Sequence, residues 1–241
     1  MVLTLRQKLD GVTQHILYLH GGGFELHLMP EHWTIIGGLA DRLLANIVVP
    51  QYPLSPEHDH RATYRLLDEL YDDLVNRVGA DNVVISGDSA GGGLAVSFAQ
   101  HLRDRGAALP AALVLFCPWA DLTVSDPAQT GLARHDRILS ISRARAAGKA
   151  WAGKLLPNDP RINSLFASMA GLPPTLVLTG THDIMNSDAH RLMTSAKASD
   201  ADFTLSEYPG MFHVWMGLPI PEGAEAIEEA SMFIERHLVG W

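Results

Sequence analysis

One pentapeptide constrains the fold of this chain more than any other stretch: Gly87-Asp88-Ser89-Ala90-Gly91. It follows a short β-branched run at 82–86, typical of a buried strand, and precedes a stretch of helical composition that continues through Leu102. A serine at a sharp turn between strand and helix is the setting of the G-x-S-x-G nucleophile elbow. Glycines on both sides let strand and helix approach closely at such a turn. A glycine-rich loop that only connects the two elements is the alternative.

Apolar runs elsewhere in the chain alternate with amphipathic helical stretches. Strands are predicted at 46–49, 82–86, 112–117, 175–179 and 203–208, and helices at 31–45, 61–78, 187–199 and 222–238. Strands that are apolar on both faces and alternate with helices are typical of a parallel sheet covered on both sides. Near the N-terminus, Asp10-Gly11 between the runs 2–9 and 15–20 predicts an antiparallel hairpin. We therefore expect a single α/β domain over residues 1–241.

The stretch from about 121 to 171 does not fit this alternation. It is long, contains no clear strand, and includes one helical piece at about 141–156. An insertion after a strand lies at the edge of the sheet where α/β proteins bind ligands. We interpret it as a cap over the site; a surface excursion without a role is the alternative.

Composition narrows the class of protein. The chain has 241 residues, of which 47% are hydrophobic and 19% charged, as in ordinary globular proteins. A formal net charge of −9 argues against nucleic acid as the main partner. The N-terminus has no apolar signal core, no apolar run is long enough to span a bilayer, and the one cysteine, Cys117, excludes an internal disulfide. We expect a cytoplasmic protein without a membrane span.

A serine hydroxyl needs a base to become a nucleophile, so one of the twelve histidines should serve it. His213 follows the last predicted strand, which is where the order serine, acid, histidine would place the base. Other histidines lie on stretches expected to be solvated: His27, His32, His58, His60 and His101.

The base in turn needs a carboxylate that holds its tautomer and stabilises its charged form. Asp183 follows the strand at 175–179 and lies between the serine and the histidine in the chain. Asp188 is the weaker rival, because it stands at the start of a predicted helix and could simply cap it.

Acyl transfer also requires donors for a developing oxyanion. Gly21-Gly22-Gly23 follows the early strand at 15–20, and consecutive glycines allow several backbone N–H groups to face one point. The N–H of Ala90, which begins the helix after the elbow, would supply the other half of the oxyanion hole. A flexible turn is the alternative for the glycine run.

Five blocks together carry a resemblance to a known family. They are HGGGF from His20, YPLSPEH from Tyr52, GDSAGGGLA from Gly87, DPRINSLFASMAGLPPTLVLTGTHDIMNSDA from Asp159 and EYPGMFHVW from Glu207. The chain thereby resembles the hormone-sensitive-lipase-like branch of the α/β-hydrolase fold, the bacterial fold-3 carboxylesterases. The resemblance implies Ser89 as nucleophile, Asp183 as acid and His213 as base. It also implies Gly22, Gly23 and Ala90 as oxyanion donors, with Gly21 as the next candidate.

The same resemblance implies that the Tyr52 block packs near the glycine loop and that Asp88 is structural. Family members usually carry several dozen residues before HGGG, including helices that build half of the cap, whereas nineteen precede it here. We therefore expect a reduced cap and an acyl pocket that is more open, or that a partner subunit completes. A truncated N-terminus is the other alternative. Since family members often dimerise, a homodimer is one expectation.

The function that these parts predict is a serine carboxylesterase acting on short-chain acyl esters. A lactonase or an N-acyl amide deacetylase would use the same residues, and a non-catalytic small-molecule receptor on this fold is an alternative of another class. No cofactor and no metal are expected, because neither H-E-x-x-H nor paired Cys/His spacing occurs.

Overall fold

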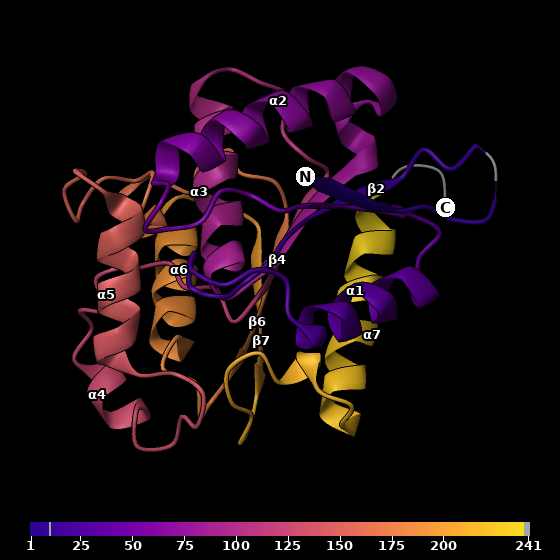
Figure 1. Cartoon of the computed structure of the whole chain (residues 1–241). Coiled ribbons are helices and arrows are strands. Elements are labelled where there is room, and N and C mark those ends of the chain that lie inside the picture. The colour runs from indigo at the N-terminus through magenta and orange to yellow at the C-terminus, as the bar shows by residue number, and fades with distance from the viewer. Residues whose placement is uncertain (10, 239–241) are drawn as a thin grey trace.

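A computed structural model describes residues 1–9 and 11–238, in which a central sheet lies between two layers of helices (Figure 1). The strands are β1 (Val2–Leu5), β2 (His15–Leu19), β3 (Asn46–Pro50), β4 (Val83–Asp88), β5 (Ala112–Phe116), β6 (Thr175–Gly180) and β7 (Phe203–Tyr208). The α-helices are α1 (Pro30–Arg42), α2 (His60–Val78), α3 (Ala90–Asp104), α4 (Ala128–Leu132), α5 (Ile141–Ala152), α6 (Asn186–Ala198) and α7 (Pro221–His237). Short 3₁₀ turns are η1 (Ala80–Asn82), η2 (Ser164–Phe166) and η3 (Trp215–Gly217).

The described strands form one sheet in the order β1-β3-β2-β4-β5-β6-β7, and every neighbouring pair except β1 with β3 is parallel. The predicted parallel sheet is therefore confirmed. Since parallel strands place their carboxyl ends at one edge, the loops after β2, β4, β5, β6 and β7 gather there.

The predicted N-terminal hairpin is wrong. Both sides of β2 are occupied by β3 and β4, so β1 instead pairs antiparallel with the outer edge of β3, Val2 opposite Pro50 and Leu5 opposite Ile47. Of the expected hairpin turn, Asp10 lies outside the described residues.

Successive side chains of β2 face opposite layers of the core, as the strand pleat requires. Ile16 and Tyr18 pack in the layer of α1 and α7, whereas Leu17 and Leu19 pack in the layer of α2, α3, α5 and α6. Figure 1 shows α1 and α7 together on one side of the sheet and α2, α3 and α6 on the other. Because the strands have apolar side chains on both faces, the sheet is buried on both sides.

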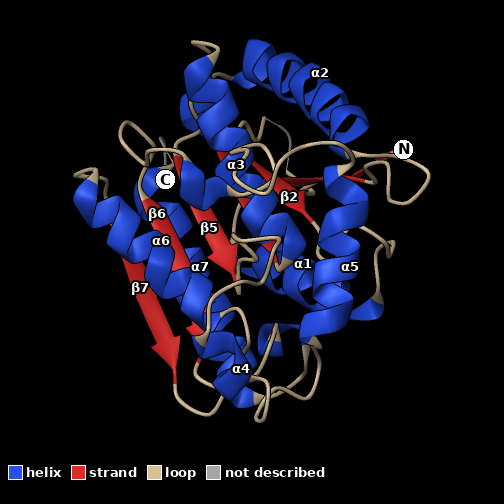
Figure 2. Cartoon of the chain, turned by 90° about the vertical axis from the view of Figure 1, so that its left-hand side faces the viewer, coloured by secondary structure: helices blue, strands red, loops and turns tan. Residues whose placement is uncertain are grey.

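The stretch between β5 and β6 contains α4, α5 and η2 but no strand. The predicted helix at 141–156 ends earlier, at Ala152, because Gly153 adopts a positive φ of 63°. Figure 2 shows α4 beyond the arrowhead of β5, at the carboxyl edge of the sheet. The side chain of Trp151, from α5, stacks on Phe24 with ring centroids 3.9 Å apart. The insertion thus contacts the loop that follows β2.

Candidate active site

Ser89 lies between the end of β4 and the start of α3 with φ 53° and ψ −119°, a backbone conformation that costs a non-glycine residue about 1–3 kcal/mol. Its N–H donates to the carbonyl of Phe116 (2.8 Å), and its own carbonyl accepts the N–H of Trp119 (2.9 Å). A Cβ added at Gly87 would lie 2.6 Å from the carbonyl oxygens of Leu19 and Gly91, so only glycine fits there. The expected close approach of strand and helix at this turn is present.

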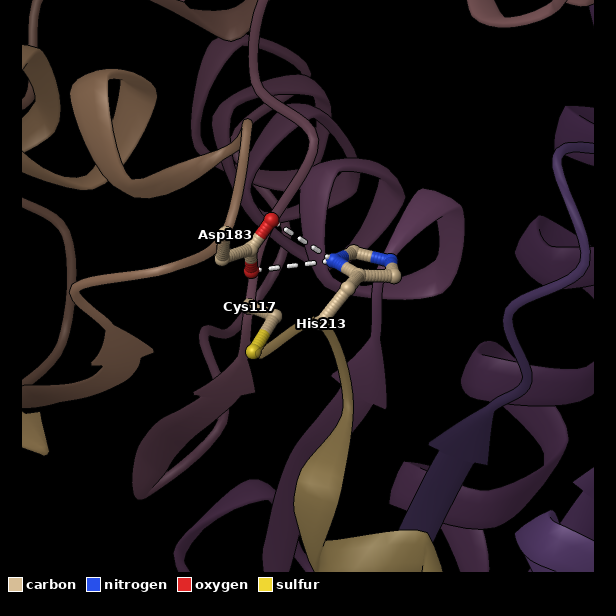
Figure 3. Close-up of side chains that lie close together, drawn as sticks. All are labelled: Cys117, Asp183 and His213. Carbon is tan, nitrogen blue, oxygen red and sulfur yellow. Dashed lines mark hydrogen bonds and ion pairs between the residues drawn. The ribbon is translucent and has the colours of Figure 1, made fainter. Parts of the chain in front are cut away.

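Three side chains from three different loops form one hydrogen-bonded line. The Ser89 Oγ lies 2.8 Å from Nε2 of His213, which follows β7. Nδ1 of His213 lies 2.9 Å from Oδ2 and 3.0 Å from Oδ1 of Asp183, which follows β6 (Figure 3). Because the carboxylate can only accept, Nδ1 carries the proton and Nε2 is free to take one from the serine hydroxyl.

The charges around His213 favour the protonated form of its imidazole. Burial alone would lower the pKa of His213, but the charge of Asp183 and its hydrogen bond outweigh burial and raise that pKa above its ordinary value. Asp183 is fully buried, and its Oδ1 also accepts the backbone N–H of Met185 (2.8 Å). The carboxylate is thus held in place before any substrate binds.

The weaker acid candidate, Asp188, lies elsewhere. It is fully buried in the first turn of α6, where its Oδ2 accepts the N–H groups of Ala120 (3.1 Å) and Asp121 (2.9 Å). Its carboxylate therefore holds the loop after β5 rather than His213, and it does not cap its own helix. Burial raises the pKa of Asp188 to about 7.

Cys117 lies beneath the histidine–carboxylate pair (Figure 3). Its Sγ accepts the backbone N–H of Val214 (3.3 Å), and the ligand atoms of Cys117, Asp183 and His213 lie within 4.8 Å of one another. A metal ion needs a thiolate and a free imidazole nitrogen, but burial raises the pKa of the Cys117 thiol well above its ordinary value, and Nδ1 of His213 already donates to Asp183. The donor set thus fits a packed thiol better than a metal ligand.

The glycine loop after β2 turns sharply beside the elbow. Gly22 and Gly23 adopt φ values of 101° and 64°, which favour glycine. Among the described residues their N–H groups have no acceptor, and the N–H of Ala90, in the first turn of α3, has none within the helix. The N–H of Gly21, by contrast, donates to Oδ1 of Asp88 (2.9 Å), so this next candidate is already engaged.

The block at Tyr52 packs on this loop, as expected. The Tyr52 ring stacks on the ring of His20 at 4.4 Å and its hydroxyl donates to the carbonyl of His20. The N–H of Ser55 donates to the carbonyl of Phe24 (2.8 Å). The loop is therefore held from the side opposite the elbow.

Two histidines expected to be solvated are buried. His32 accepts the N–H of Met29 at Nδ1 (2.8 Å), and its Nε2 lies 3.4 Å from Oδ2 of Asp88. His60 begins α2 and packs edge-on against Trp151. The signal was present in the sequence, because apolar residues follow at helical spacing: Ile35, Ile36 and Leu39 after His32, and Tyr64 and Leu67 after His60. Each histidine thus lies on the buried face of its helix.

Comparison with known proteins identifies the family of this chain. The model of the alpha/beta hydrolase fold family matches residues 16–217. An acetyl-hydrolase of Streptomyces hygroscopicus is 34% identical over 234 residues, which are 93% of this chain and 76% of the relative. An esterase of Acinetobacter venetianus is 31% identical over 229 residues, covering 92% of this chain and 74% of the relative.

Solved structures extend the likeness to three dimensions. An esterase from the bacterial hormone-sensitive lipase family superposes with a TM-score of 0.91 at 30% identity, covering 98% of this chain and 85% of that one. The structure of EstE5 soaked by p-nitrophenyl butyrate gives a TM-score of 0.93 at 28% identity, with coverage of 99% and 82%. The chain therefore has the α/β-hydrolase fold. The chain belongs to the hormone-sensitive-lipase-like family of carboxylic ester hydrolases with that fold.

No helix in the described part of the chain is both long and apolar enough to cross a membrane.

Proposed function

We propose that this protein is a serine carboxylesterase that hydrolyses short-chain acyl esters through Ser89, His213 and Asp183. The observation that carries the proposal is the unbroken line of hydrogen bonds from the Ser89 Oγ through His213 to Asp183. Its members come from three separate loops, and a merely structural arrangement would not require a strained serine backbone at its end.

The chemistry follows from this order of groups. Nε2 of His213 takes the hydroxyl proton while the Ser89 Oγ attacks the ester carbonyl, and Asp183 stabilises the imidazolium that forms. The same nitrogen then gives the proton to the departing alcohol, which leaves an acyl-enzyme. Water attacks the acyl-enzyme by the same route and releases the carboxylic acid.

The oxyanion of each tetrahedral intermediate would bind to the N–H groups of Gly22, Gly23 and Ala90. These donors belong to backbone that is held in place before substrate arrives, so little reorganisation is needed as charge develops. Gly21 plays no such part in this proposal, because Asp88 already accepts its N–H.

Short acyl chains are proposed because aromatic rings fill the space behind the glycine loop. Phe24 follows that loop directly, stacks on Trp151 and lies 6.0 Å from the ring of Trp119. The gap that these rings border measures about 10 Å³, which is about the space of one water molecule. A long acyl chain would have to displace a ring of this cluster.

A lactone or an N-acyl amide could react with the same groups, and the choice between them depends on the leaving-group side. The receptor alternative is disfavoured, because a binding protein needs no serine hydrogen-bonded to a carboxylate-held histidine. The homodimer, the cytoplasmic location, the single domain over 1–241 and the cap at about 121–171 stay predictions.

The test is a series of p-nitrophenyl esters from acetate to octanoate, with a lactone and an N-acetyl amide beside them. We expect the shortest esters to have the highest kcat/KM, and Ser89→Ala to lower kcat by roughly 10⁴-fold or more. Ser86→Ala is the matched control, since its buried hydroxyl has no hydrogen-bond partner within the described part of the chain and its loss should leave the rate unchanged. Equal hydrolysis by the parent and Ser89→Ala would refute the proposal.

A further inference from the structure

One carboxylate of the insertion reaches the loop that carries Asp183. Asp136 lies between α4 and α5 with 8% of its surface exposed. Its Oδ1 accepts the N–H groups of Ile138 and Leu139, both at 2.8 Å, and its Oδ2 accepts the N–H of Ile184 at 2.9 Å. One oxygen thus serves the local turn of the insertion, and the other serves the loop after β6.

The contact falls beside the proposed acid. Ile184 directly follows Asp183, and the next N–H, that of Met185, donates to Asp183 itself (2.8 Å). Two successive N–H groups of this loop therefore donate to carboxylates: that of Ile184 to Asp136 of the insertion, and that of Met185 to Asp183 of the loop itself. Because Asp183 must present both oxygens to Nδ1 of His213, the orientation of this backbone sets the geometry of the hydrogen-bonded line.

We propose that Asp136 is a positioning residue for the hydrolysis: its carboxylate holds the loop of Asp183 in register with His213, and its negative charge assists the imidazolium. The inference rests on the proposed function of Ser89, His213 and Asp183. It gives the insertion a part in the chemistry, besides any part in covering the site.

The charge of Asp136 acts in the same direction as that of Asp183. Burial lowers the pKa of His213, whereas Asp183 first, and then Asp136 and Asp88, raise it. A further titratable neighbour, Cys117, stays a neutral thiol because burial raises the pKa of that group. Removing the charge of Asp136 should therefore lower the pKa of His213, and the base should stay unprotonated to a lower pH.

Asp136→Asn separates the two contacts of this side chain. An asparagine can keep its oxygen on the turn at Ile138 and Leu139, but its NH₂ group then faces the N–H of Ile184, so two donors meet. In the opposite orientation of the amide, its oxygen accepts the N–H of Ile184 but its NH₂ group faces the N–H groups of Ile138 and Leu139, so those two hydrogen bonds are lost instead. Asp136→Ser is the second variant, because a serine hydroxyl can still accept the N–H two residues on but is too short to hold the loop after β6.

The experiment measures kcat/KM for p-nitrophenyl acetate as a function of pH. We expect Asp136→Asn and Asp136→Ser to lower kcat/KM by on the order of 10-fold, because the loop of Asp183 loses a hydrogen bond to a charged group and His213 is then less well positioned. We also expect the acid limb of kcat/KM to move to lower pH. Asp126→Asn is the matched control. Asp126 lies in the same insertion, and among the described residues its carboxylate accepts only the N–H of Ala128 (2.9 Å), so the rate and the acid limb should stay as in the parent.

A parent-like rate in both Asp136 variants would overturn the inference, as would a lower rate with an unshifted acid limb, which indicates a purely structural role. If Asp136→Asn does not fold, the serine variant decides alone. These results are distinct from a failure of the proposed function, which would appear as hydrolysis by the parent that does not depend on Ser89.

Discussion

Asp88 accepts the backbone N–H of Gly21 at 2.9 Å, so the residue beside Ser89 holds the glycine loop that follows β2. The same carboxylate accepts the hydroxyl of Tyr18 (2.7 Å) and lies 3.4 Å from Nε2 of His32. Since Nδ1 of His32 accepts a backbone N–H, its Nε2 carries the proton and points it at Asp88. The elbow and the proposed oxyanion loop are thus fixed to each other by one buried side chain.

Asp88→Asn should slow the acyl transfer more than it weakens substrate binding. An asparagine can still accept from Gly21 and Tyr18, but its NH₂ group meets the N–H of His32, and the loop loses a charged anchor. We expect kcat to fall by roughly 10- to 100-fold with KM nearly unchanged, because the oxyanion forms only in the transition state. The measurement is steady-state kinetics on p-nitrophenyl acetate, with Tyr18→Phe as a milder change in the same network. A rise in KM at constant kcat would contradict this role.

Trp151 should set the limit on acyl length. Trp151→Leu removes the ring that stacks on Phe24 and opens space behind the glycine loop. We expect the ratio of kcat/KM for p-nitrophenyl octanoate to that for the acetate to rise at least about tenfold, as about 1.4 kcal/mol of relieved overlap would produce.

Phe233→Leu controls for the loss of a buried aromatic ring as such. Phe233 lies on α7, in the layer on the other side of the sheet, and cannot line this space. Its substitution should lower the thermal midpoint without changing the ratio between long and short esters. An unchanged ratio in Trp151→Leu would show that the acyl chain lies elsewhere.

Asp188 should make stability depend on pH. Its pKa is about 7 in the folded chain, because of burial, and close to 4 when the chain is unfolded. Between these values the folded state binds a proton that the unfolded state does not, so the contribution of Asp188 to the free energy of unfolding falls as pH rises from about 4 to 7. The slope is about 1.4 kcal/mol per pH unit where the two states differ by a whole proton.

Asp188→Asn removes this titration. Urea unfolding of parent and variant at pH 5 and pH 8 gives the difference in stability at each pH, in which the other titrating groups cancel. We expect the parent to lose about 2–3 kcal/mol relative to the variant between the two conditions. A difference that is the same at both pH values would show that Asp188 is ionised throughout.

Much of the fold could be predicted because it follows from local patterns. The apolar runs at 82–86, 112–117 and 175–179 are short and continuous, as strands buried on both faces are, and their alternation with helices indicates a covered parallel sheet. The elbow could be recognised because strand, Gly-x-Ser-x-Gly and helix are contiguous in the chain. The family was identified from blocks of the same local kind.

The tertiary structure decided which strands pair and which partners the buried polar side chains meet. Asp10-Gly11 favours a hairpin between β1 and β2. Because β3 and β4 pair with the two edges of β2, β1 pairs with β3 instead. His32 was expected in solvent. Its spacing from Ile35, Ile36 and Leu39 places it on the apolar face of α1, but its partner Asp88 follows only from the packing of α1 against the elbow.

The sequence by itself determined the chemical parts and their order: a serine on an elbow, a glycine loop, an acid after one strand and a histidine after the next. Only the tertiary structure decided which carboxylate meets His213, that Asp88 takes the N–H of Gly21, and that Asp136 of the insertion reaches the loop of Asp183. The physical reason is that hydrogen bonds between loops join residues 30 to 124 positions apart. Their partners are selected by how strands are ordered in the sheet, which no local pattern encodes.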